Sequence, residues 1–166
     1  EIAQCLVGSE MCIRDRHDCY GETKNMNSSN TNSGGWTSCA MRSTHLPAIL
    51  ALMPTEVQNG IREVNKLTSA GSQSATINTT ADKLFLLSEI EIFGSVSYSK
   101  SGEGTQYDYY KAGNSKVKKF NGSAGIWWER SPRGSNSTYF CTVNGYGDAT
   151  YADASAAYGV AFGFCF

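Results

Sequence analysis

Stretches of polar residues alternate along the chain with short segments of regular apolar spacing. Residues 25–35 are rich in Asn, Ser and Gly and predict a loop, because these residues compete with regular backbone hydrogen bonding. Over residues 37–53, apolar side chains recur at near-helical spacing, which predicts a helix that Pro47 kinks or divides. A short second helix is expected after it, with Thr55 as the N-cap and Gln58 completing a capping box.

The middle of the chain predicts two strands and one short helix. Residues 61–68 predict a strand that leads into a flexible polar segment at residues 69–80. The continuous apolar run at residues 84–87 is typical of a fully buried strand. Ser88 is expected to cap one turn of helix, which Gly94 ends.

The second half of the chain begins with irregular structure and continues with strands. Residues 95–124 predict a long irregular segment with one helical turn near residues 107–111. Residues 125–131 predict a strand, residues 138–155 a hairpin, and residues 158–166 a last strand. These elements together predict an α+β fold with two early helices and a C-terminal antiparallel sheet with hairpins.

The predicted strand GIWWERS carries the expected structural anchors. Trp127 and Trp128 are consecutive, so they point to opposite faces of a strand. Either both are structural, or one of them helps to floor a ligand pocket, since an indole can stack on a sugar. Glu129 and Arg130 are either a catalytic pair or structural residues. The permanent charge of Arg130 favours a role in tying loops together, so we expect Trp127, Trp128 and Arg130 to be anchors.

The segment that follows combines tyrosines with short polar residues, as antibody paratopes do. Phe140 and Val143 are expected to point inward, and Gly145 and Gly147 to supply the positive φ that a tight turn requires. The expected ligand-binding residues are the other polar and aromatic side chains: Arg133, Ser135, Ser137, Tyr139, Thr142, Asn144, Tyr146, Asp148, Tyr151, Asp153 and Tyr158. An ordinary solvated hairpin is the alternative.

The N-terminal segment has a different character from the rest. Residues 5–16, CLVGSEMCIRDR, resemble the translation of a transposase-type sequencing adapter. We therefore expect residues 1–16 to be non-native and residues 17–166 to form a single domain that is truncated at its N-terminus. Residues 1–16 hold two of the 14 basic and three of the 15 acidic residues, so 12 of each remain. This balance gives no reason to expect a nucleic-acid partner, and no apolar run reaches the about 20 residues of a membrane span.

Cysteine and histidine spacing points away from metal and catalytic sites. Cys19, Cys39, Cys141 and Cys165 lie outside residues 1–16 and show no C-x-x-C spacing. Buried thiols are the favoured interpretation, with a Cys141–Cys165 pair as the alternative. The sequence contains no G-x-S-x-G, H-E-x-x-H or phosphate-binding glycine motif, so we expect no enzyme and no cofactor. Calcium-dependent sugar binding in true C-type lectins uses the motif E-P-N or Q-P-D together with W-N-D. None of these motifs occurs, so we expect no calcium site.

Five blocks of the sequence carry a resemblance to a known family. GGWTSCAMR, DKLFLLSEIEIFG, SGEGTQYDYY, IWWERSP and YGVAFGFCF occur in that order. They resemble an uncharacterised family of gut Firmicutes and their bacteriophages, which is similar to the C-type lectin-like fold. That fold is shared with the variable proteins of diversity-generating retroelements and with formylglycine-generating enzymes. The closely spaced cysteine pair that holds copper in those enzymes is not matched by Cys141 and Cys165.

The resemblance implies a display scaffold whose last hairpins present a ligand-binding face. We expect a receptor-recognition module on a phage tail or cell surface that binds a bacterial-surface protein or glycan. The alternative is a structural decoration or assembly domain of a virion or bacterial envelope protein, without a ligand of its own. In either case we expect the domain to be located on a virion, at the cell surface or outside the cell. On a virion, the domain could form a homo-oligomer.

Overall fold

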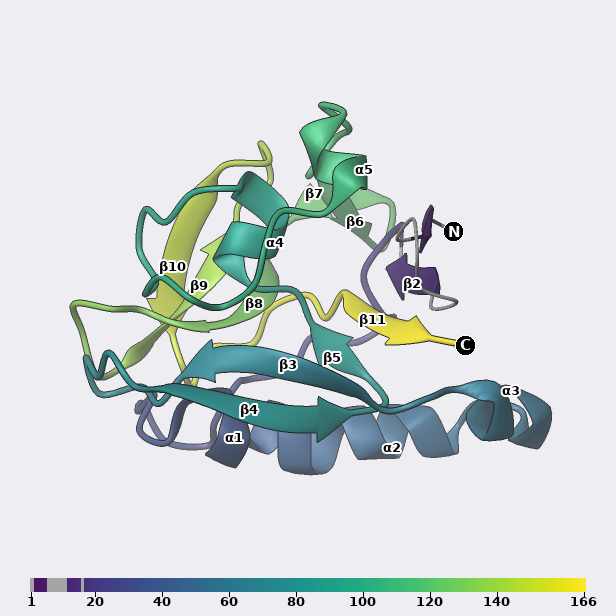
Figure 1. The fold of residues 1–166 in the computed structure, drawn as a ribbon, viewed down its shortest axis with the longest axis horizontal. Helices are drawn as coiled ribbons and strands as arrows, with labels where there is room; N and C mark the ends of the chain where they lie inside the picture. The colour runs from purple at the N-terminus through teal and green to yellow at the C-terminus, as the bar shows by residue number, and fades with distance from the viewer. Residues whose placement is uncertain (1, 6–11, 16) are drawn as a thin grey trace.

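The computed structural model describes residues 2–5, 12–15 and 17–166, which form an α+β fold of short helices and antiparallel sheets (Figure 1). The helical segments are α1 (Gly35–Ser38), the π-helix η1 (Met41–His45), α2 (Leu46–Ala51), α3 (Thr55–Gly60), α4 (Glu89–Phe93) and α5 (Asp108–Lys111). The strands are β1 (Ile2–Cys5), β2 (Cys12–Asp15), β3 (Val64–Ser69), β4 (Ile77–Asp82), β5 (Phe85–Leu86), β6 (Lys118–Phe120), β7 (Ser123–Gly125), β8 (Trp127–Pro132), β9 (Tyr139–Val143), β10 (Ala149–Asp153) and β11 (Phe162–Cys165). The predicted fold class, with early helices and C-terminal hairpins, is confirmed.

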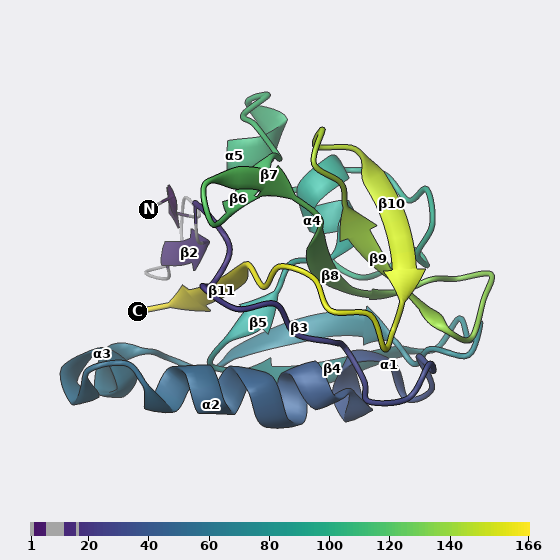
Figure 2. The same cartoon turned by 180° about the vertical axis from the view of Figure 1, so that it is seen from behind.

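The strands are arranged in four sheets. The orders are β1-β2-β11-β5 and β10-β9-β8, with β3-β4 and β6-β7 as two-stranded hairpins. The row of helices from α1 to α3 runs along one side of the molecule beneath β3 and β4, whereas β8–β10 and α4 lie on the other side (Figures 1 and 2). Strand β2 pairs antiparallel with β11, so part of the segment expected to be non-native belongs to a sheet with the C-terminal strand.

Two details of the early helices differ from expectation. The helix predicted over residues 37–53 is interrupted at Cys39, whose φ of −72° and ψ of 149° are extended. The backbone at His45 and Leu46 keeps helical angles, so η1 runs directly into α2, and Pro47 in the first turn of α2 divides this helical run into its π-helical and α-helical parts, as predicted. The cap of α3 is Pro54 and not Thr55, and the Gln58 amide donates to the Met53 carbonyl at 2.7 Å without forming the expected capping box.

Several later predictions are confirmed and others are wrong. Ser88 and Glu91 form a reciprocal capping box on α4, which ends at Gly94 with φ 73°. Of the two turn glycines, only Gly147 has a positive φ, at 89°, so the prediction for Gly145 is wrong. The predicted strand at residues 61–68 corresponds to β3, but the segment expected to be flexible contains most of its partner β4, and the segment expected to be irregular contains β6 and most of β7. The last strand, β11, is shorter than the predicted 158–166.

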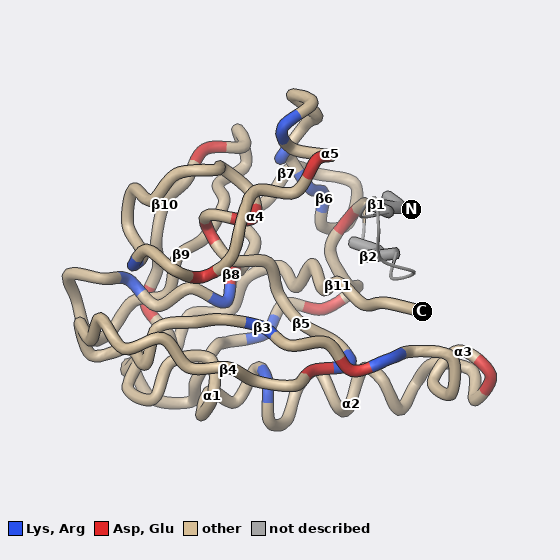
Figure 3. The backbone as a smooth tube through the Cα atoms, viewed as in Figure 1, with Lys and Arg blue, Asp and Glu red and all other residues tan. Residues whose placement is uncertain are grey.

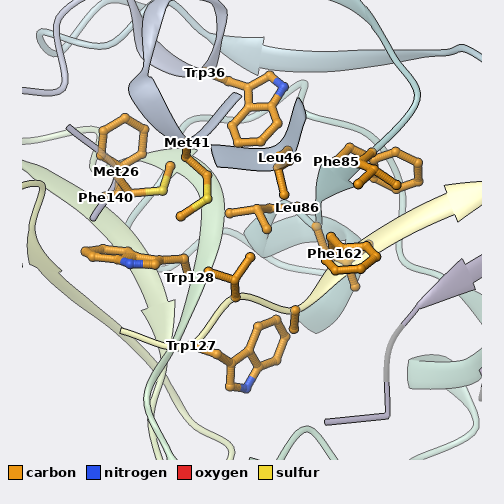
Figure 4. Packing of buried hydrophobic residues seen from close by; sticks show 14 of the residues in the cluster. Met26, Trp36, Met41, Leu46, Phe85, Leu86, Trp127, Trp128, Phe140 and Phe162 are labelled. Atoms are coloured by element: carbon orange, nitrogen blue, oxygen red, sulfur yellow. The ribbon is translucent and has the colours of Figure 1, made fainter. Parts of the chain in front are cut away.

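The core lies between the helical row and the C-terminal sheet. Its largest side chains are fully buried: Trp36, Trp127, Trp128, Phe85, Phe140 and Phe162. Figure 4 shows the indoles of Trp127 and Trp128 pointing away from each other, as consecutive strand residues must. Their N–H groups donate to the carbonyls of Lys116 and Lys24, so both rings are satisfied inside the protein. Within the described ranges, no helix has the length and apolar character to cross a membrane.

Candidate functional site

Arg130 holds several segments together in the interior. Its side chain is fully buried, with Nη1 2.5 Å from Glu91 Oε2 and Nη2 2.9 Å from Glu91 Oε1. The remaining N–H groups donate to the carbonyls of Leu67, Leu86 and Glu103. A guanidinium fork is suited to this two-point contact with a carboxylate. Arg130 therefore joins β8 to β3, β5, α4 and the segment that precedes α5.

Lys66 extends this buried network. Its Nζ lies 2.6 Å from the Tyr107 hydroxyl, 3.4 Å from Glu91 Oε1 and 3.8 Å from the centroid of the Phe85 ring. Burial lowers the pKa of Lys66 against the opposing effect of Glu91. Burial alone would raise the pKa of Glu91, but the Arg130 and Lys66 cations hold it below its ordinary value. The network is closed to solvent, so we assign it to the support of the fold.

Two further buried glutamates hold the segment between α4 and α5 against the sheet. The Glu89 carboxylate accepts hydrogen bonds from the backbone N–H groups of Ser97, Tyr98 and Ser99 and from the Ser99 hydroxyl. The Glu103 carboxyl accepts from the Ser69 N–H at 2.8 Å and makes a short hydrogen bond with the Ser131 hydroxyl. These bonds give the loop that carries Tyr98 a defined position beside β10.

The loop brings Tyr98 to the predicted hairpin face. Tyr139 and Tyr151 stack with ring centroids 5.3 Å apart, and Tyr98 meets Tyr151 edge-on at 5.0 Å. The Arg133 guanidinium carbon lies 3.5 Å from the Tyr151 centroid, 5.5 Å from that of Tyr139 and 5.9 Å from that of Tyr98. We call these four residues the Arg133–tyrosine cluster.

The Arg133 side chain has no polar partner in the described part of the chain. It makes neither a hydrogen bond nor an ion pair there, and its Nε is buried without an acceptor. Its terminal nitrogens are not buried, so they reach solvent. Tyrosine rings hold a guanidinium through their electron-rich faces without neutralising its charge. The cluster thus presents an oriented cation that is free to bind an anion.

The other predicted ligand-binding residues fall into different environments. Tyr146, at the tip of the β9-β10 hairpin, is 88% exposed, and Ser135 and Ser137 are also exposed. Asn144 shapes the turn, because its Oδ1 accepts from the N–H groups of Tyr146 and Asp148. The Asp153 carboxylate accepts from the side-chain amide of Asn30 at 2.7 Å.

Two predicted residues lie away from this surface. Thr142 is fully buried, so the expectation that it is exposed is wrong. The reason is that both faces of β9 are covered, and its neighbours Phe140 and Val143 are buried as predicted. Tyr158 is half-buried and packs edge-on against Trp128 with ring centroids 5.3 Å apart, so it contributes to the core.

Sequence analysis missed Tyr98, Lys100, Glu89 and Glu103. Tyr98 and Lys100 lie in a segment without periodicity, and only the folded chain brings Tyr98 to the cluster and the Lys100 side chain beside Gly134. Glu89 gave no local signal of burial, because an acid in the first turn of a helix is an ordinary surface feature that the helix dipole favours. The Gly134 N–H donates to the Tyr98 carbonyl at 2.7 Å and fixes the two loops side by side.

Glu129 is not paired with Arg130. The Glu129 side chain is fully buried, and neither carboxyl oxygen has a hydrogen-bond partner among the described residues. Burial, reinforced by Glu89 and Glu103, raises the pKa of Glu129 well above its ordinary value. The catalytic-pair alternative for Glu129 and Arg130 therefore lacks the contact it needs.

The remaining candidate features are a surface depression away from the hairpin face, possible metal ligands and the cysteines. A surface depression of about 220 Å³ lies between α2 and β4, and Arg42, one of the two cations that line it, is already paired with Asp82 at 2.6 Å. The described residues include no group of three or more His, Cys, Asp or Glu side chains that could hold a metal ion. Cys141 and Cys165 are buried free thiols, in agreement with the favoured interpretation.

The comparisons with known proteins identify a family. No curated protein and no solved structure matches the chain. One family model, described as a domain of unknown function, matches residues 4–165. This match begins inside the segment expected to be non-native, and the origin of that segment stays a prediction. Because the match spans nearly the whole chain, the protein belongs to the family of domains of unknown function DUF6273.

Proposed function

We propose that this domain is a ligand-recognition module with a C-type lectin-like fold. Its C-terminal hairpin face, with the Arg133–tyrosine cluster at the base and Tyr146 at the tip, binds a protein or glycan on a bacterial surface. The module works on a phage tail or at a cell surface, outside the cytoplasm. It does so without inserting into a membrane and without binding nucleic acid.

The observation that supports this proposal best is the unpaired Arg133 guanidinium among three tyrosines at the protein surface. Tyrosine supplies a large, rigid contact area at a small entropic cost, and arginine is enriched at binding hot spots. A domain that only decorates a particle has no need for an oriented cation without a partner. The charges are otherwise dispersed along the chain with both signs interspersed (Figure 3), which gives no broad basic face for nucleic acid.

The cluster also rests on a rigid base. Tyr98 is held by the Glu89 carboxylate, and the strand that leads to Arg133 contains the buried Arg130. Preorganised side chains lose little entropy when a ligand binds. Substitutions on the exposed surface are therefore expected to change binding without unfolding the protein.

The test is binding of the purified domain to whole cells of gut Firmicutes. We expect Tyr151→Ala and Tyr146→Ala to weaken binding by roughly tenfold each, as hot-spot residues do. Leu52→Ala is the matched control, because Leu52 is a large apolar side chain that is 75% exposed on the helical side of the molecule. If the wild-type domain binds no cells, or if both tyrosine variants bind as well as the control, the display function is rejected and the decoration alternative gains support.

A further inference from the structure

We infer that the Arg133–tyrosine cluster binds the carboxylate of an acidic sugar, with Lys100 as a second cation. This inference rests on the proposed function and names the chemistry of its ligand. Whether a carboxylate can bind there depends on which acidic and basic side chains near the cluster already form ion pairs or hydrogen bonds.

Lys100 lies next to Arg133 in space. A Cβ built on Gly134 would be 3.0 Å from Lys100 Cε and 3.1 Å from Cδ, so the lysine side chain runs along the backbone beside Arg133. In the described part of the chain, Lys100 makes no hydrogen bond or ion pair. Lys100 therefore brings a second cation without an ion-pair partner to the loop that carries Arg133.

The acidic groups near the cluster make their contacts with residues other than Arg133 and Lys100. Glu89 uses both carboxylate oxygens on the backbone of residues 97–99 and on the Ser99 hydroxyl. Asp153 accepts a hydrogen bond from Asn30. Glu129 is fully buried and has no polar partner, so it makes no hydrogen bond to Arg133. In the described part of the chain, none of these carboxyl groups forms an ion pair with Arg133 or Lys100, so both cations can pair with an acidic ligand.

The orientation of Arg133 favours a carboxylate. Its guanidinium carbon lies 3.5 Å from the centre of the Tyr151 ring, and its terminal nitrogens, unlike Nε, are not buried. This arrangement leaves the two-nitrogen edge of the guanidinium available for a two-point contact with two oxygens. Lysine acts as a point charge and adds attraction without a defined geometry.

The surroundings favour a sugar as the carrier of the carboxylate. Tyr151 is 37% exposed, and aromatic rings present an apolar face beside a polar hydroxyl. The exposed side chains of Ser135 and Ser137 are short hydroxyls that can exchange hydrogen bonds with a ligand rich in hydroxyl groups. An acidic sugar combines C–H faces, hydroxyls and a carboxylate in one ring.

The test uses calorimetric titration of the domain with four polymers. These are an oligomer of galacturonic acid, the same oligomer fully methyl-esterified, polyglutamate and inorganic polyphosphate. The ester is the matched control, because it removes the negative charge and otherwise differs only by the added methyl group. We expect the acid oligomer to bind at least tenfold more tightly than each of the other three. Equal binding of acid and ester, or equal or tighter binding of polyglutamate or polyphosphate, overturns the inference.

Variants then place the site. We expect Arg133→Ala to weaken binding of the acid oligomer at least tenfold, with smaller losses for Arg133→Lys and Lys100→Ala. Arg62→Ala is the control for charge, because Arg62 is exposed and lies beside β11 at the other end of the molecule. Melting temperatures show that each variant is folded. If all three cluster variants bind like Arg62→Ala, the inference is wrong.

The two proposals fail in distinguishable ways. Cell binding that depends on Tyr151, without binding of the acid oligomer, overturns the acidic-sugar inference and leaves the recognition function. Loss of both kinds of binding overturns both.

Discussion

The buried carboxyl of Glu103 is expected to make the stability of the domain depend on pH. Burial raises its pKa from 4.5 to about 7, partly offset by hydrogen bonds with Ser131 and Ser69. In the range between these two values, the folded protein keeps a proton that the unfolded chain has released. The free energy of unfolding therefore falls as pH rises through this range, and the protonated carboxyl is the stable form in the core.

The magnitude follows from the size of the shift. One pKa unit corresponds to about 1.4 kcal/mol, and linkage over this shift gives a loss of about 2.5 kcal/mol between about pH 5 and about pH 8. Such a loss is a substantial part of the roughly 5–15 kcal/mol that stabilises a typical domain.

Glu103→Gln is the informative variant, because glutamine imitates the protonated carboxyl. Its Oε1 can accept from the Ser69 N–H, and its Nε2 can donate to the Ser131 hydroxyl oxygen, which already accepts from the Glu89 N–H. We expect the variant to match the wild type near pH 5 and to exceed its stability by about 2.5 kcal/mol near pH 8. Urea unfolding followed by tryptophan fluorescence at several pH values measures this difference.

The control is Glu63→Gln, which changes an exposed glutamate. It should leave the pH dependence of the wild type unchanged. If the curves of wild type and Glu103→Gln run parallel from pH 5 to pH 8, Glu103 does not titrate in this range and the reasoning from burial is refuted.

The remaining predictions concern other buried side chains. Glu129→Met is expected to raise the free energy of unfolding at neutral pH by about 1–3 kcal/mol, because it removes a buried carboxyl with no partner. Chemical denaturation measures this free energy. A clear destabilisation would show that the fold needs the carboxyl. Trp127→Ala and Trp128→Ala are each expected to cost about 3–5 kcal/mol, since both rings are fully buried. Losses below about 1 kcal/mol in both variants would contradict their role as anchors.

Local signals in the sequence predicted those elements that are defined by neighbouring residues. Ser88 and Gly94 specify α4, because the cap and the left-handed stop are contacts within one turn. The hairpin of β9 and β10 was predicted from the two glycines of its turn, of which Gly147 has the positive φ. The strands β4, β6 and β7 were missed, because their sequences are polar and no apolar alternation distinguishes them from loops.

Local sequence patterns could not predict the burial or the partners of side chains whose surroundings come from distant parts of the chain. Thr142 is polar on a strand that sequence analysis treated as half-exposed, yet packing covers both faces of β9. Arg130 was expected to tie loops together, but its partner Glu91 lies 39 residues earlier in the chain. The spacing of apolar positions carries no information about such pairs.

The sequence by itself therefore determined the α+β class, the capped helix α4, the buried tryptophan strand and the tyrosine-rich hairpin. Only the tertiary structure placed Tyr98 and Lys100 beside Arg133 and left that guanidinium without an acid. The physical reason is that a helix cap or a strand pattern depends on residues a few positions apart. The charge balance of a surface depends on loops that fold together from distant parts of the chain.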